Sequence, residues 1–324
     1  MGADIEGSPA AELRESGDHA TATGVLGADR YEVVVVSYHS KDQVAGLLDG
    51  AAVPEQRIVL VDNASGVDGA ADLLARFPRG RYIDGQNSGF AAAANKGALS
   101  STAEYLIFAN PDSRPTSQIW AALIDDLVSD PDLTVAAAAT VDPHGRIEIG
   151  VGGWEPTVRR CLVHAVGLHR LLPTAGVYAR PRPGEPVALG WITGACMAVR
   201  RTSFLGLGGF NERYFVYNED MAFGREVARA GQKQVLRTDL LVMHNAGGSG
   251  GGSRKMPQQR GASMAAYLRD RNRPAAATTM RATLAAGTLA RALVAVFTGH
   301  PAVALRHLAY LHGITTGRSP YRPG

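Results

Sequence analysis

The sequence predicts an α/β protein with a mostly parallel sheet covered by helices on both faces, and three observations support this prediction. Apolar runs recur along the first third of the chain, and each ends in small polar residues, as buried strands do where they meet a loop. Helical segments are expected between and after these runs. Strands that alternate with helices in this way form parallel sheets. The runs lie at 31–40, 57–65 and 104–115, and the helical segments at about 41–49, 67–77, 89–99 and 117–129.

Each apolar run supplies a polar strand end. The run YEVVVVSYHS is rich in β-branched residues and ends in small polar ones. The run RIVLVDNAS contains Asp62 and Asn63 at its end, and EYLIFANPDSRP contains Asn110 and Asp112. Ligands of open parallel sheets bind beyond the carboxyl ends of the strands. We therefore expect the three polar ends to lie on one edge of the sheet, beside a ligand.

The remaining sequence divides into a leader, a main domain and a tail. The leader is small, polar and of mixed charge, so it predicts disorder rather than a secretory signal. The leader covers 1–29, the main domain 30–253 and a basic helical extension 254–324. Within the main domain we expect an irregular insertion at 142–190 with a short helix at 159–172, strands at 191–201 and 234–245, and then a glycine loop at 246–254. The extension is expected to contain helices at about 275–298 and 302–313, broken at His300-Pro301.

The composition describes a globular chain. With 324 residues, 45% of them apolar and 19% charged, it can bury a sizeable core in one large domain, with or without an appendage. Cys161 and Cys196 lie far apart, which argues against a disulfide scaffold and fits a reducing cytoplasm. Because no stretch of 18 uncharged apolar residues occurs, we expect no membrane-spanning helix.

The net charge of +3 conceals an asymmetry. From Arg254 onward the chain has 11 Lys or Arg and one acid, Asp270, whereas residues 1–253 hold 22 basic and 29 acidic residues. A basic tail indicates an anionic partner: lipid, polyphosphate or nucleic acid. Nucleic acid is disfavoured, because no aromatic residues are interleaved to stack on bases. The tail helices fit packing on the main domain, and they also fit a membrane surface with arginines toward the phosphates.

Two neighbouring acids, Glu219 and Asp220, follow three aromatic residues in YFVYNEDMAFGREVARAG and open a predicted helix. Acids at a helix N-terminus complement the helix dipole, which stabilises by a few tenths to about 1 kcal/mol. Alternatively, one of the two carboxylates is held at the edge of a pocket as a base. These residues alone leave both interpretations open.

Four further positions have both a chemical and a structural interpretation. Asp62 can accept the imide N–H of a uracil or thymine ring, or it can cap the next helix. Asp112 can hold a divalent cation that bridges diphosphate oxygens, or it can form a Pro-Asp turn. Gly89, in NSGFAAAAN, can let a nucleotide approach a helix start, or it can serve tight packing. His244 can join a carboxylate on a metal below the glycine loop, or it can be structural.

Two other patterns are set aside. His164 and His169 lie five residues apart, which does not place them on one helical face, so we assign them no shared metal. No G-x-G-x-x-G follows any predicted strand, so the sequence has no dinucleotide-binding fingerprint.

Taken together, seven stretches resemble the inverting glycosyltransferases of family 2, which have the Rossmann-like GT-A fold, and most closely their bacterial rhamnosyltransferase-like branch. They are VVVVSYHS, VDNAS, NSGFAAAAN, FANPDS, WITGACMAVRR, FLGLGGFNERYFVYNED and the late His244, in the expected order over about 31–245. The resemblance covers roughly two-thirds of the chain. One such motif would be a weak signal, but seven in order are specific.

The resemblance implies roles for individual residues. Asp220 corresponds to the catalytic base, with Glu219 beside it in an orienting role. Asp112 corresponds to the last acid of a D-x-D metal motif in which Asn110 replaces the first acid, and His244 to a further ligand of Mg²⁺ or Mn²⁺. The implied nucleotide and donor site contains Ser37, Asp62 (the acid that binds the base), Asn63, Asn87, Gly89, Asn95, Asn110, Trp191, Thr193 and Gly194.

One departure bears on activity. The family pattern usually has an acid two residues after the base, and here that position is Ala222. Asn63, where some relatives have a second Asp, is a milder departure. Because of Ala222, a nucleotide-sugar-binding protein with little or no transferase activity is the alternative function. A nucleotidyltransferase is disfavoured, because no G-x-G-x-R-type loop accompanies the first strand.

The expected function is therefore metal-dependent inverting transfer of a hexose. The resemblance implies L-rhamnose from dTDP-rhamnose as the first choice, or another hexose donor, and a hydroxyl of a glycan or polyprenyl-linked acceptor. This activity would contribute to cell wall or polysaccharide synthesis in a bacterium. The enzyme would be cytoplasmic, or peripheral on the inner face of the membrane through its basic tail.

Overall fold

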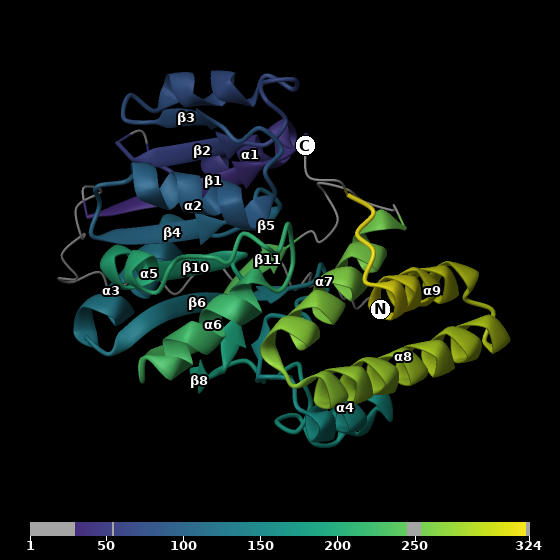
Figure 1. Ribbon diagram of the computed structural model, residues 1–324. Coiled ribbons are helices and arrows are strands. Elements are labelled where there is room, and N and C mark those ends of the chain that lie inside the picture. Colours follow the sequence, from purple (N-terminus) through teal and green to yellow (C-terminus); the bar gives the residue numbers. More distant parts are fainter. Residues whose placement is uncertain (1–29, 54, 245–253, 322–324) are drawn as a thin grey trace, which may run out of the picture.

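The computed structural model describes residues 30–53, 55–244 and 254–321, so the predicted leader and nearly all of the predicted glycine loop lie outside the described residues. Its centre is a nine-stranded sheet with the order β3-β2-β1-β4-β10-β6-β11-β5, in which β8 also pairs with β11 (Figure 1). A separate small sheet joins β7 and β9. The strands are β1 (Tyr31–Ser37), β2 (Ile58–Asp62), β3 (Arg81–Asp84), β4 (Tyr105–Ala109), β5 (Ser113–Arg114), β6 (Leu133–Val141), β7 (Gly152–Gly153), β8 (Val187–Ala188), β9 (Trp191–Ile192), β10 (Cys196–Arg200) and β11 (Lys233–His244).

The long strands are mostly parallel, as the sequence predicts. Parallel pairing joins β3, β2, β1 and β4, and it also joins β6 to β11. β10 runs antiparallel between β4 and β6. The sequence did not predict β3, which is four residues long and partly exposed, or β6, whose alanine-rich sequence has low strand propensity.

Helices cover both faces of the sheet. One face carries α1 (Lys41–Ala51), α3 (Ser117–Ser129) and the 3₁₀-helix η1 (Ala70–Arg76); the other carries α2 (Phe90–Ser100), α5 (Arg201–Gly206) and α6 (Glu219–Arg229). Side chains alternate along β1, because successive strand residues point to opposite faces. Val33 and Val35 therefore join one core with Trp120, and Val34 joins the other with Phe204.

A third layer of helices follows the sheet domain. It consists of α7 (Lys255–Arg271), α8 (Pro274–Phe297) and α9 (Pro301–Thr316), and the insertion helix α4 (Val158–Ala165), which the 3₁₀-helix η2 (Leu168–Arg170) follows, packs against α8 (Figure 1). An apolar cluster that includes Tyr214, Met221, Tyr267 and Leu284 joins α6 to these helices. The sequence predicts α8 and α9 closely but not α7. The tail therefore packs on the sheet domain through α7.

Two features of the structure bear on expectations from the sequence. Among the described helices, α8 is long and apolar enough to cross a membrane by length and composition alone, although it contains Arg281 and Arg291 and a third of its most apolar window is buried. Length and composition alone do not show that α8 spans a membrane, so the expectation of no membrane-spanning helix stays a prediction. The rings of His164 and His169 do meet, stacked with centroids 4.4 Å apart. Helical spacing does not apply to them, because α4 ends at Ala165 and Gly167 (φ +78°) turns the chain back.

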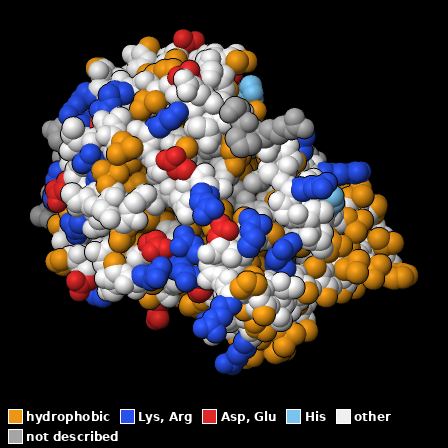
Figure 2. Space-filling view, in the orientation of Figure 1, with side chains coloured by type: hydrophobic (Ala, Val, Ile, Leu, Met, Phe, Trp, Pro, Cys, Tyr) orange, Lys and Arg blue, Asp and Glu red, His pale blue; other side chains and the backbone are white. Residues whose placement is uncertain are grey.

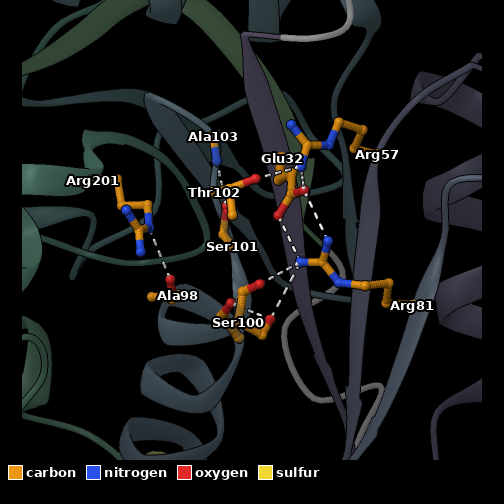
Figure 3. Close-up of polar contacts among 10 residues, drawn as sticks. Glu32, Arg57, Arg81, Ala98, Ser100, Ser101, Thr102, Ala103 and Arg201 are labelled. Atoms are coloured by element: carbon orange, nitrogen blue, oxygen red, sulfur yellow. Dashed lines mark hydrogen bonds and ion pairs between the residues drawn. The ribbon is translucent and has the colours of Figure 1, made fainter.

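The amino ends of β1, β2 and β3 are joined by a buried carboxylate. Glu32 is fully buried, and its two oxygens accept hydrogen bonds from the guanidinium groups of Arg57 and Arg81, the latter at 2.9 Å (Figure 3). Arg81 also donates to the carbonyl oxygen of Ser100, at the end of α2, at 3.0 Å. Two cations thus compensate one buried anion, as a buried charge requires.

Candidate active site

The opposite edge of the sheet opens into a cavity. Ser37, Asp62 and Asp84 lie in register at the carboxyl ends of β1, β2 and β3, while Asn110 follows β4. Beyond this edge lies a cavity of about 760 Å³. Of the residues predicted to form the site, seven line it: Asn63, Asn87, Gly89, Asn110, Asp112, Thr193 and His244.

Two predicted metal ligands meet in this cavity. The Nε2 of His244 lies 3.2 Å from the Oδ1 of Asp112, and its Nδ1 lies 2.8 Å from the Oε2 of Glu148. Burial lowers the pKa of His244, but the hydrogen bonds to the two carboxylates outweigh burial and raise it to about 9. Glu148 also accepts a hydrogen bond from the hydroxyl of Thr140 at 2.8 Å. The imidazole is therefore fixed from both sides.

The chemistry of this trio fits a divalent cation bound together with a diphosphate. Mg²⁺ is usually held by one or two carboxylates plus substrate phosphates rather than by an all-protein cage. Asp112 offers a carboxylate and His244 its Nε2, while Glu148 fixes the other ring nitrogen, as outer-shell carboxylates do for metal-binding histidines. Within the described residues, no group of three or more His, Cys, Asp or Glu side chains could hold a metal by itself.

The acid pair lies at the N-terminus of α6. Glu219 is buried, and its Oε2 has no hydrogen-bond partner among the described residues. Burial, reinforced by the charge of Asp220, raises the pKa of Glu219 well above its usual value. Burial also raises the pKa of Asp220 to about 6, although the backbone N–H of Met221 donates to its Oδ1 at 2.7 Å and Arg260 opposes the shift. Both carboxyl groups of the pair therefore keep their protons to a higher pH than ordinary Asp and Glu side chains do.

The two acids do not line the cavity themselves, but Tyr217 connects them to it. Tyr217 lines the cavity, and Arg260 lies over its ring at 4.7 Å from the centroid. Burial raises the pKa of Tyr217, Arg260 opposes that shift, and the charges of Glu219 and Asp112 both add to it. One phenol thus lies near both the acid pair and the predicted metal ligand.

Strained backbone brings two loops together at this point. Non-glycine residues with positive φ occur in pairs just before two helices: Gln86 and Asn87 before α2, and Tyr217 and Asn218 before α6. Such conformations cost about 1–3 kcal/mol each and cluster at functional sites. A Cβ on Gly89 would lie 2.4 Å from the carbonyl oxygen of Phe215, so the close approach of these loops requires glycine there.

Five predicted donor-site residues are buried around the cavity but do not line it. Asp62 accepts hydrogen bonds from the backbone N–H groups of Ala64 (2.8 Å) and Gly66 (2.7 Å) and from the hydroxyl of Tyr82 (3.1 Å). Both its oxygens thus hold the loop after β2, as a capping residue does. The neighbouring Asn63 does line the cavity, and its Oδ1 is buried without a partner among the described residues.

The other four residues support the cavity wall. Asn95 donates to the carbonyl oxygen of Phe210 at 2.8 Å and accepts from its N–H at 2.9 Å, which ties α2 to the loop before the acid pair. Ser37 hydrogen-bonds to Ser40 at 3.0 Å. Trp191 is buried in the cluster under α6, and Gly194 lies against Phe90. The roles assigned to all five stay predictions.

Sequence reasoning missed several residues of the site. Glu148 lies in the predicted irregular insertion, and its contact with His244 spans 96 positions, so no local pattern identifies it. Arg260 and Met264 belong to α7, which was not predicted. Ala222 is buried in the apolar cluster between α6 and the C-terminal helices. An acid at that position would lie among apolar side chains, where an unpaired carboxylate is costly.

Known proteins resemble the chain in sequence. Residues 32–149 match the family model described as glycosyl transferase family 2. An N-acetylglucosaminyl-diphospho-decaprenol L-rhamnosyltransferase of Mycobacterium tuberculosis is 29% identical over 249 residues, 69% of this chain and 78% of that protein. The O-antigen biosynthesis protein RfbC of Myxococcus xanthus is 24% identical over 244 residues, 69% of this chain but 18% of that protein.

Solved structures share the fold. A mannosyltransferase from Pyrobaculum calidifontis, solved in complex with GDP-Man and Mn²⁺, superposes with a TM-score of 0.56 at 16% sequence identity. The match covers 89% of this chain and 86% of that one. At this identity the likeness concerns the fold alone.

Proposed function

We propose that this chain, which resembles family 2 glycosyltransferases in sequence and has the GT-A fold, is an inverting enzyme that moves a sugar from a nucleoside diphosphate to an acceptor hydroxyl. The acid pair of the buried Glu219 and the partly buried Asp220, which has no salt bridge among the described residues and lies beside the cavity that Asp112 and His244 line, is the observation that carries this proposal. The name of the M. tuberculosis relative supports L-rhamnose as the sugar, from dTDP-rhamnose, and a polyprenyl-diphosphate-linked acceptor.

The proposed reaction is a single displacement. Asp220 accepts the proton of the acceptor hydroxyl while that oxygen attacks C1 of the sugar, and the bond from C1 to the diphosphate oxygen breaks with its electron pair, so the configuration inverts. Its pKa of about 6 leaves Asp220 mostly ionised at neutral pH. The pKa of Glu219 is raised well above its usual value, and in its protonated form Glu219 can donate a hydrogen bond that orients the acceptor or Asp220.

The donor would lie at the edge formed by β1, β2 and β4. Asn63, with its unpartnered Oδ1, and Asn87 line the cavity there, and Thr193 enters it just before β10. Asp62 would act on the nucleotide base through the loop that its carboxylate holds. Asp112 and His244 would hold Mg²⁺ or Mn²⁺, with Glu148 fixing the imidazole. When bound, the cation would neutralise charge that develops on the leaving diphosphate.

We place the enzyme on the cytoplasmic face of a membrane, where its tail would contact lipid. Exposed apolar side chains gather on α8 and α9, and Figure 2 shows them at the end of these helices with Lys and Arg side chains nearby. We call this set the apolar hairpin surface: Leu289, Leu293, Val294, Val296, Phe297, Val303, Leu305 and Leu308. The sequence has no Asp or Glu after Asp270, which suits an anionic bilayer. The free cysteines Cys161 and Cys196 fit a reducing compartment.

The test of the base is Asp220→Asn in the full chain. We expect the transfer rate to fall by about 10²- to 10⁴-fold, because general-base catalysis is lost. Binding of dTDP should survive, because Asp220 does not line the cavity in which the donor would bind. Near-normal transfer by this variant would refute the assignment of the base.

The test of the membrane contact is co-sedimentation with vesicles. The full chain should bind vesicles of anionic lipid more strongly than neutral ones, and Phe297→Ser with Leu293→Ser should weaken that binding, because both side chains are exposed on the apolar hairpin surface. Exposed Leu99→Ser, on α2 of the sheet domain, is the control. A concentration-dependent dimer that the double variant abolishes would instead assign this surface to a second copy of the chain.

A further inference from the structure

The cavity does not end at the sheet edge. Its wall continues over the C-terminal helices, where α8 and α9 contribute Arg291, Arg306 and Tyr310, and α4 contributes His164. The donor and the metal, as proposed, occupy the edge formed by Asn63, Asp112 and His244. The end under α8 and α9 therefore has room for a second ligand group.

This second end has unused cationic donors. Neither Arg291 nor Arg306 has a carboxylate partner among the described residues. Arg291 donates to the Oγ1 of Thr288 at 3.2 Å, and its contacts with the carbonyl oxygens of Ala165 and His164 are long, at 3.4 and 3.5 Å. A guanidinium has five N–H donors. The sequence has no acid at 156–184 or after 270, in the segments that form α4, α8 and α9, so this end favours an anion.

His164 adds an uncharged donor or acceptor. Its Nδ1 is buried and has no hydrogen-bond partner among the described residues. Burial, together with nearby His169, Arg291 and Arg180, lowers the pKa of His164 to about 3, so the imidazole is neutral. A neutral imidazole N–H can donate to a phosphate oxygen, and a buried orphan nitrogen gains from such a partner.

The two ends belong to one cavity, so a single extended substrate can contact both. Tyr178 also lines this cavity, and its pKa, raised chiefly by burial, is also affected by the charges of Arg260, Asp220 and Arg291. An anion at Arg291 would lie on the side of the C-terminal helices. Next to Arg291, α8 continues into Leu289, Leu293 and the rest of the apolar hairpin surface.

We propose that Arg291, Arg306 and His164 bind the diphosphate of a lipid-linked acceptor, whose hydrocarbon chain leaves along the apolar hairpin surface into the membrane. This inference rests on the proposed function, and it gives the enzyme two separate diphosphate sites. The donor diphosphate lies at the sheet edge with Asp112 and His244. The acceptor diphosphate lies under α8 and α9, and its sugar points toward Asp220.

The test measures two ligands at once. Farnesyl diphosphate, a short polyprenyl diphosphate, is titrated calorimetrically into the full chain saturated with dTDP and Mg²⁺. It should bind one to one without displacing dTDP. Arg291→Gln and Arg306→Gln should each weaken its binding by about tenfold or more, because each removes charge-assisted hydrogen bonds. Arg273→Gln, an equal loss of charge at the exposed start of α8 and outside the cavity lining, should change it by less than about twofold.

Three results would overturn the inference. Farnesyl diphosphate could displace dTDP mole for mole, which would mean that the chain has a single diphosphate site. The Arg273→Gln variant could weaken binding as much as Arg291→Gln does, which would mean that the loss of affinity comes from the change in net charge and not from a specific contact. Inorganic diphosphate could bind as tightly as farnesyl diphosphate, which would assign the site to a free anion. Failure of the proposed function looks different, because dTDP would then not bind the wild-type chain with or without Mg²⁺.

Discussion

Buried carboxylates at the two edges of the sheet differ in whether they have positively charged partners. At the amino edge, Glu32 is fully buried and accepts hydrogen bonds from two arginines (Figure 3). At the carboxyl edge, the buried Glu219 has an oxygen without a partner among the described residues, and its neighbour is another acid, Asp220. A buried charge with full compensation stabilises the fold only modestly, but removing one partner is costly. Buried acids without compensation destabilise the fold, and they are typical of catalytic sites.

The comparison predicts that substitutions at the two edges separate stability from activity. Changes at Glu32 should affect folding and leave turnover per folded molecule unchanged. Changes at the acids of the carboxyl edge should do the reverse. Four predictions test this separation, beginning with the largest expected effect.

The first prediction concerns Asp112→Asn. Loss of the carboxylate should lower the transfer rate by about a hundredfold or more, because charge on the leaving diphosphate is no longer compensated. The measurement is initial rate against Mg²⁺ or Mn²⁺ concentration. Asp84→Asn, at the exposed end of β3 on the same edge but outside the cavity lining, should stay within about twofold. Equal losses in both variants would mean that general charge, rather than a site at Asp112, sets the rate.

The second prediction concerns Glu32→Gln. Removing this charge leaves two arginines without their anion, so the free energy of unfolding should fall by about 3 kcal/mol, as measured by urea denaturation. Glu104→Gln breaks a more exposed ion pair with Arg30 on the same edge and should cost less than about 1 kcal/mol. Glu219→Gln should be neutral or stabilising, because the folded state already favours the uncharged acid. If Glu219→Gln lowers the free energy of unfolding more than Glu32→Gln does, the proposed difference between the two edges is wrong.

The third prediction concerns Glu148→Gln. The amide no longer fixes His244 as a carboxylate does, so the concentration of Mn²⁺ needed for half-maximal activity should rise by about 10- to 100-fold. Activity at saturating Mn²⁺ should largely recover, which a general folding defect would not allow. Glu185→Gln, on the exposed part of the same insertion, is the control. If the variant needs no more Mn²⁺ than the wild type, Glu148 does not support metal binding.

The fourth prediction concerns pH. Asp220 must be ionised to act as a base, so kcat/KM should rise with pH and level off above a midpoint near 6. Arg260→Gln should move this midpoint upward, because Arg260 lowers the pKa of Asp220, and the rate at pH 6 should fall by less than about tenfold. A profile that stays flat from pH 5 to 8 would contradict the assignment.

The same shifts affect stability with the opposite sign. The folded state holds the protons of Glu219 and Asp220 more tightly than the unfolded state does. The contribution of Asp220 to the free energy of unfolding is therefore complete below its unfolded-state pKa and is lost as pH rises through about 6. Asp220→Asn should reduce this pH dependence. Asp220 thus becomes ionised over the same pH range in which its contribution to stability is lost.

Local patterns predicted the sheet and its polar edge well. Buried parallel strands such as β1, β2 and β4 appear as apolar runs, and the polar residues at their ends then share an edge by geometry. The 3.6-residue patterns of α1, α2 and α3 are local in the same way. The motif around Glu219 and Asp220 identified a helix start with two acids, which the structure has as α6.

Long-range packing explains what the sequence did not predict. The helix α7 contains Pro257 and Gly261, and glycine inside a helix costs up to about 1 kcal/mol relative to alanine. Tertiary contact accounts for this glycine, because a Cβ on Gly261 would lie 2.3 Å from the carbonyl oxygen of Tyr310 in α9. Gly313 is in the same position relative to Gln258, with a Cβ that would lie 2.0 Å from its carbonyl oxygen. No local pattern shows such a pairing of helices far apart in the chain.

The close crossing of α7 and α9 has a consequence for where the functional unit ends. Met256, Arg260 and Met264 of α7 line the cavity, and α9 packs closely against this helix. Cutting the chain at residue 253, the predicted end of the main domain, would remove this part of the cavity wall and expose apolar side chains of α6. The smallest fragment able to catalyse transfer must therefore extend through α9, and an expression clone trimmed to the recognisable part would be inactive and prone to aggregate.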